Sequence, residues 1–115
     1  MHNLELAWET FEFHVASSMN NELLLSQYKA KLRNKAFNEA LAPKLKSCIQ
    51  RLINDYQKQN NTLDELINIH KEYSLHGIPI PKEREVPLMY LNELKNTNAT
   101  LINQLKHRIS NFPSF

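Results

Sequence analysis

In this 115-residue chain, histidine and cysteine are the residue types that most often bind metals or take part in catalysis. The chain holds one cysteine, Cys48, and five histidines, which are His2, His14, His70, His76 and His107. Their spacing contains neither HxxxH nor HExxH, and no second cysteine can complete a zinc site with Cys48. His70 and His107 could face each other across a helical hairpin, but two imidazoles alone make a poor site. The sequence therefore predicts no metal site and no cofactor.

Two catalytic arrangements could in principle use the same histidine and cysteine residues. A di-iron bundle requires a glutamate three residues before an inward histidine, but Phe11 and Ile67 occupy those positions before His14 and His70. A cysteine–histidine pair would need Cys48 beside a histidine and an oxyanion site in a cleft. Cys48 instead falls beside an apolar helix stripe, where cysteine behaves as a small apolar residue. We expect no catalytic residues, so the chain is not predicted to be an enzyme.

The composition favours helices over strands. The chain has a single glycine, 17 leucines and 14 asparagines, whereas valine and threonine together supply six residues. Phosphate-binding loops of the GxGxxG or GxxxxGK[ST] type each need at least two glycines, so both are excluded. Hairpin turns also need residues that tolerate a positive φ. The predicted fold is all-α: one domain over residues 1–115, a small antiparallel bundle of three to four helices with a long coiled-coil-like helical hairpin.

Apolar periodicity and capping residues predict where the helices lie. The expected helices span residues 3–18, 21–41, 44–75 and 87–111. Serine and asparagine side chains cap helices, so the polar stretch at 17–21 favours a break there, with Asn21 as the next N-cap. Pro43 suits the first turn of the third helix. The proline-rich connection 78–87 is predicted to be extended and stiff.

The third helix has the clearest pattern in the chain, a heptad seam whose spacing alternates between four and three residues. Its members are Leu45, Ile49, Leu52, Tyr56, Gln59, Leu63, Leu66, His70 and Tyr73. Gly77 follows, where a left-handed residue would end the helix. The last helix carries a matching stripe, so the two helices should form an antiparallel hairpin with Gln59 and Asn98 in its seam. Either the first two helices cover the overhanging seam, or a second copy covers it in a homodimer.

Charge is unevenly distributed, although the net charge is only +2. Residues 1–28 hold four acids and no base, whereas residues 29–51 hold seven bases and one acid. An acidic first helix and a basic second helix could neutralise each other when packed. Alternatively, the basic segment could contact nucleic-acid phosphates by charge. The residues predicted for that contact are Lys29, Lys31, Arg33, Lys35 and Lys46.

The first helix is apolar over more of its circumference than one neighbour requires. Leu6 and Phe13 form a second apolar stripe beside the main one. Two interpretations remain open: a packed core between the first two helices, or an apolar face that takes a partner helix. For the second interpretation, the predicted partner-binding residues are Trp8, Phe11, Val15 and Leu24.

The N-terminus shows no secretory signal, and no apolar run approaches the ~20 residues that span a bilayer. A lone cysteine fits a reducing compartment, so we expect a cytoplasmic protein without a membrane partner. The outline, a short all-helical chain with heptads and a polar-seam hairpin, resembles flagellar and type III export chaperones and other small coiled-coil adaptors. The resemblance implies a non-enzymatic adaptor or chaperone-like protein. A nucleic-acid-associated regulator is the alternative.

Overall fold

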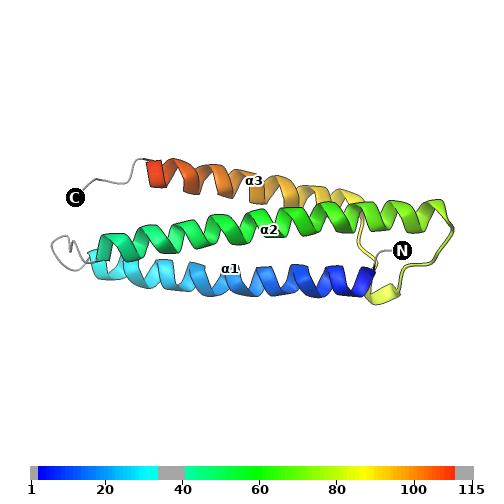
Figure 1. The fold of residues 1–115 in the computed structure, drawn as a ribbon, viewed down its shortest axis with the longest axis horizontal. Helices are drawn as coiled ribbons and strands as arrows, with labels where there is room; N and C mark the ends of the chain where they lie inside the picture. The colour runs from blue at the N-terminus through cyan, green and yellow to red at the C-terminus, as the bar shows by residue number, and fades with distance from the viewer. Residues whose placement is uncertain (1–2, 34–40, 111–115) are drawn as a thin grey trace.

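The computed structural model describes residues 3–33 and 41–110, which form an antiparallel arrangement of three α-helices. The helices are α1 (Leu4–Arg33), α2 (Leu41–Leu75) and α3 (Leu88–Ser110), with a one-turn 3-10 helix, η1 (Lys82–Arg84), between the last two. The central helix, α2, contacts both α1 and α3, and the whole measures 61 × 21 × 20 Å (Figure 1). Within the described ranges there is no strand. The predicted all-α antiparallel bundle is confirmed.

α1 is one continuous helix, so the predicted break at residues 17–21 is wrong. Asn3 caps its start as its side-chain oxygen accepts a hydrogen bond from the Leu6 amide at 3.1 Å. The Ser17 hydroxyl and the Asn21 amide instead donate sideways to the Asp55 carboxylate of α2, at 3.0 and 2.8 Å. Because these side chains find partners on α2, they need not cap a helix end. Leu41, where the second helix was predicted to end, is the first residue of α2, so α2 begins three residues earlier than predicted and holds Pro43 in its first turn. Residues 34–40 lie outside the described residues.

The seam of α2 is buried as the sequence predicts. Eight of its nine members are buried, and Tyr73 at the end is half-buried. Gly77 ends the helix with φ +66°, and the Ile78 amide donates to the Tyr73 carbonyl at 2.8 Å. The Gly77 amide donates to the Ser74 carbonyl at 3.3 Å, which completes a Schellman motif. The only glycine therefore stands where the backbone requires a left-handed residue.

The core consists of two apolar clusters strung along α2. In one, Trp8 of α1 and Leu91 of α3 pack with Leu66 and other residues of α2. In the other, Leu25 and Leu105 pack against the first half of α2. α1 thus covers the part of the α2 seam that α3 leaves uncovered. From the sequence alone, this role could fall either to the first two helices or to a second copy of the chain.

The connection between α2 and α3 covers one end of this core. It leaves the end of α2, passes beside the N-terminal half of α1 and returns to α3 (Figure 1). Its Ile80 and Val86 side chains are half-buried against the cluster that contains Trp8. Apart from η1 the segment is non-helical, which agrees with its proline content. Pro87 stands just before α3 rather than in its first turn, and its carbonyl accepts a hydrogen bond from the Tyr90 amide at 3.0 Å.

Candidate interaction surface

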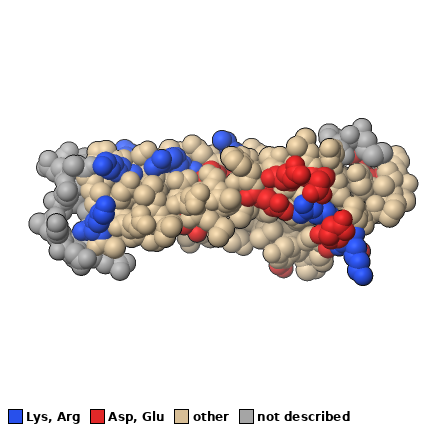
Figure 2. Space-filling view, turned by 90° about the horizontal axis from the view of Figure 1, so that it is seen from below, with Lys and Arg blue, Asp and Glu red and all other residues tan. Residues whose placement is uncertain are grey.

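The face of α1 that points away from α2 carries large apolar side chains in contact with solvent. Leu6, Phe13, Met19 and Leu23 are 58%, 68%, 63% and 61% exposed. Figure 2 looks onto α1 from below, and uncharged residues fill the middle of that view. Burial of such side chains against another molecule would be favourable by about 25 cal/mol for each Å² of apolar surface removed from water. We call this set of four residues the outer face of α1.

The periodicity of the helix explains why α1 is apolar on two sides. Leu6 and Phe13 are seven residues apart and therefore share one side of the helix. Trp8 and Leu25 lie on the other side, where they are 8% and 7% exposed and belong to the core. Only this second side is used by the fold, so the outer face is not required to hold the three helices together.

The four predicted partner-binding residues lie inward of this face. Trp8 is buried and meets the ring of Phe11 edge-to-face at 5.9 Å between ring centroids. Val15 and Leu24 are half-buried, and Leu24 packs against the core. A binding role for these four stays a prediction, but Trp8, Phe11 and Leu24 make contacts with the core that hold α1 in place. The seven-residue spacing of Leu6 and Phe13 was the sequence signal that pointed to the outer face instead.

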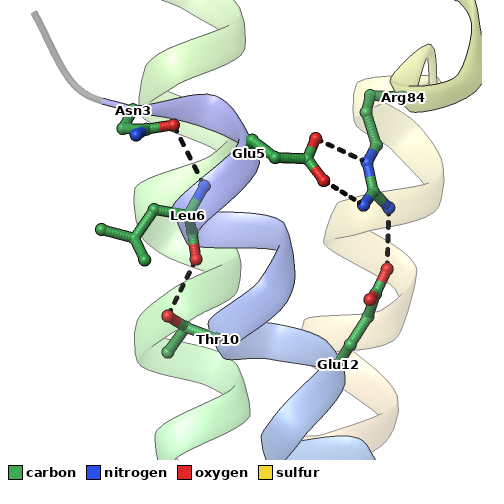
Figure 3. A network of polar contacts seen from close by, with 6 residues as sticks. All are labelled: Asn3, Glu5, Leu6, Thr10, Glu12 and Arg84. Carbon is green, nitrogen blue, oxygen red and sulfur yellow. Dashed lines mark hydrogen bonds and ion pairs between the residues drawn. The ribbon is translucent and has the colours of Figure 1, made fainter.

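Beside the outer face, Arg84 joins the connection to the acidic half of α1. Its guanidinium donates to Glu5 at 2.6 and 3.1 Å and to Glu12 at 2.7 Å, and it lies 5.6 Å from the centre of the Trp8 ring (Figure 3). The hydrogen bond with Arg84 holds the pKa of Glu5 below its ordinary value, and the two carboxylates raise the pKa of Arg84. Leu6 points away from this ion pair (Figure 3). The sequence alone did not reveal this role for Arg84, because its acidic partners lie 79 and 72 residues away along the chain.

Lys29, Lys31 and Arg33 continue α1, whereas Lys46 belongs to α2. The predicted packing of a separate basic second helix against the acidic first one is therefore wrong. Lys31 and Lys46 are exposed, and Lys29 is half-buried and has an interaction partner. Lys35 lies outside the described residues, as does the side chain of Arg33. Because one helix carries both charge types in succession, acidic side chains gather toward one end of the face and basic side chains toward the other (Figure 2).

A polar layer joins all three helices at their middle. The Gln59 side-chain nitrogen donates to the Ser18 hydroxyl at 3.0 Å and to the His14 carbonyl at 3.1 Å. The Gln59 side-chain oxygen accepts from the Asn98 amide at 3.1 Å. Gln59 and Asn98 are therefore buried, hydrogen-bonded members of the seam, as the sequence predicts. Such a layer favours one register of the helices, because any shift would leave buried polar groups without partners.

A shallow groove runs between α1 and α3 on the side of this layer away from the connection. It encloses about 360 Å³ and is lined by residues of all three helices. Leu52 and Tyr56 of α2 contribute to its lining, and the Tyr56 hydroxyl donates to the Glu22 carboxylate. Burial, followed by the bond to Glu22, raises the pKa of Tyr56 above its ordinary value of 10.0. The remaining lining residues are Leu25, Leu101, Gln104, Leu105 and Arg108.

The histidine and cysteine candidates are parts of the packed structure. Cys48 is fully buried, its thiol donates to the Asn21 carbonyl at 3.2 Å, and burial raises its pKa. His70 is buried in the seam, with Nδ1 2.7 Å from the Leu66 carbonyl oxygen. Within residues 3–33 and 41–110, no three histidine, cysteine, aspartate or glutamate side chains are grouped so that they could hold a metal ion.

Comparison with known proteins adds no relative. The chain matches no protein-family model, no curated protein and no solved structure. In the part of the chain that the structure describes, no helix combines the length and the apolar character needed to cross a membrane.

Proposed function

We propose that this chain is a non-enzymatic helical interaction protein, an adaptor that binds a protein partner through the outer face of α1. The observation that carries the proposal is the exposure of Leu6, Phe13, Met19 and Leu23 on one helix whose other side already completes the core. Single exposed apolar residues are common on protein surfaces, whereas a contiguous apolar patch is typical of an interaction site.

The mechanism is helix packing. Side chains that recur every three or four residues along α1 would fit between those of a partner helix. The glutamates at one end of the face and the lysines at the other would favour one direction of that helix over the opposite one. Because α1 is held to α2 by the hydrogen bonds of Asp55 and Gln59, the surface is ordered before a partner binds.

Capture of partners on immobilised protein tests the proposal. Phe13→Glu places a charge in the middle of the outer face, and Met89→Glu makes the same change at a residue of α3 that is 74% exposed. We expect proteins retained by the wild type to be retained by Met89→Glu and lost with Phe13→Glu. Equal retention by all three proteins would show that the outer face is not the binding surface.

A second candidate function, nucleic-acid binding, is favoured by the gathering of basic side chains at one end of the α1 face (Figure 2). Lys31 of α1 and Lys46 of α2 are exposed and could contact phosphates. Binding of generic duplex DNA and RNA at two salt concentrations tests this alternative. Nucleic-acid binding through these lysines requires an affinity that falls steeply as salt is raised and that Lys31→Glu reduces. Weak binding that changes neither with salt nor with Lys31→Glu would exclude this function.

A further inference from the structure

We propose that the partner of the outer face is a second copy of this chain, bound with the two α1 helices antiparallel. This inference rests on the function proposed above and assigns its partner. It extends Leu6, Phe13 and Leu23 of the outer face to a longer row of exposed residues on α1 that has the spacing of a coiled-coil seam; Met19 lies beside this row.

The exposed side of α1 is a heptad pattern that the fold leaves uncovered. The residues recur at alternating intervals of three and four and are all exposed, namely Leu6, Glu9, Phe13, Ala16, Asn20, Leu23, Gln27 and Ala30. A seam of this length with alternating three and four spacing packs side by side with another helix of the same period. The buried seam of α2 has the same spacing and is covered by α1 and α3, whereas no residue within 3–33 and 41–110 buries this one.

The charged and amide residues along the seam favour a second helix that runs in the opposite direction. In the register that sets Phe13 against the partner's Leu23, Leu6 lies against the partner's Ala30. In the same register Glu9 lies against the partner's Gln27, so its carboxylate meets an amide that can donate to it. A two-fold axis repeats each contact, as an isologous interface requires. A parallel pairing in register would instead set Glu9 beside the partner's Glu9.

Charge complementarity favours the same orientation. Residues 1–28 carry four acids and no base, and the bases of α1 begin at Lys29. In the antiparallel pair the acidic half of each α1 lies beside the basic end of the other, where Lys31 is exposed. In Figure 2 the acidic side chains gather toward one end of the molecule, with some basic atoms among them, and the charged side chains toward the other end are basic. A parallel pair would superpose like charges, which disfavours association.

The experiment uses the full chain and two single-cysteine additions, Leu6→Cys and Ala30→Cys, one of them carrying a mass tag. Fully buried Cys48 stays in place in both proteins. Under mild oxidation we expect a disulfide between the two variants when they are mixed, and none when either is alone. Wild-type chain should sediment as a concentration-dependent dimer. Phe13→Glu should raise the dimer dissociation constant at least about tenfold, whereas Met89→Glu should not.

Two results would overturn the proposal. Leu6→Cys chains that cross-link to one another would show a parallel pair, and wild-type chain that sediments as a monomer at every concentration would show no pair at all. The monomer result would leave the proposed function standing if Phe13→Glu still released captured proteins. If the wild-type chain forms no dimer and also retains no protein that Phe13→Glu releases, both proposals are contradicted.

Discussion

Asn98 of α3 donates a hydrogen bond of 3.1 Å to Gln59 of α2, and both side chains are buried. Gln59 in turn donates to Ser18 of α1, so a single side chain connects the three helices. Apolar residues flank this layer on both sides along α2. The relationship explains how a rod with few turns holds one register between helices that could otherwise slide by a heptad.

Removal of Gln59 should destabilise the fold. Gln59→Leu leaves the Asn98 amide buried without this acceptor, and we expect a loss of about 1–3 kcal/mol in the free energy of unfolding. The double variant Gln59→Leu/Asn98→Leu removes both polar groups and should recover part of that loss. Urea unfolding of the single and double variants measures the coupling. Additive effects of the two changes would show that the hydrogen bond contributes nothing to stability.

The contact of Arg84 with Glu5 and Glu12 should make stability depend on pH. Because the folded chain holds the pKa of Glu5 below its ordinary 4.5, the contribution is fully present above pH 4.5 and is lost as the pH falls through the lower, folded value. We expect Arg84→Met to lower the melting temperature at neutral pH and to reduce the acid dependence of melting. Lys82→Met, an exposed change two residues away, serves as the control. The same acid dependence in wild type and Arg84→Met would show that the ion pair does not stabilise the fold.

Tyr56 should titrate late and weaken the fold at high pH. Its pKa is raised above 10.0, first by burial and then by the bond to Glu22. The corresponding stability is fully present below pH 10.0 and is lost as the pH rises toward the folded value. In ultraviolet titration, Tyr56→Phe should remove a late tyrosinate transition, whereas Tyr90→Phe should leave it. If Tyr56→Phe leaves the late transition of the wild type unchanged, the hydroxyl that titrates late belongs to another tyrosine.

Cys48 should react slowly with thiol reagents while α1 is in place. The thiol is fully buried, bonded to the Asn21 carbonyl, and held protonated by a raised pKa. We expect the labelling rate to rise sharply only in the urea range where the helices separate. Rapid labelling of the native protein would contradict the packing of α1 on this part of α2.

The buried seam, its polar members and the end of α2 at Gly77 were predictable, because they depend on local periodicity and on backbone conformation. The wrong prediction of a break at 17–21 could not be avoided from the sequence. Ser17 and Asn21 favour a helix cap unless another helix supplies hydrogen-bond partners for their side chains. Those partners on α2, Asp55 above all, become neighbours only through the tertiary fold. In the same way, periodicity revealed two apolar stripes on α1 but not which of them faces the core.

Photo-crosslinking in cells can show whether the outer face of α1 contacts another protein. A photoreactive phenylalanine analogue would replace Phe13, 68% exposed on the outer face of α1, and in a control Tyr90, 52% exposed on α3. Our account predicts covalent protein adducts from position 13 and none above background from position 90. An adduct of twice the mass of the chain identifies the second copy, and a heavier or lighter one identifies another protein. Equal or absent adducts at the two positions would contradict the claim that the outer face of α1 is an interaction surface.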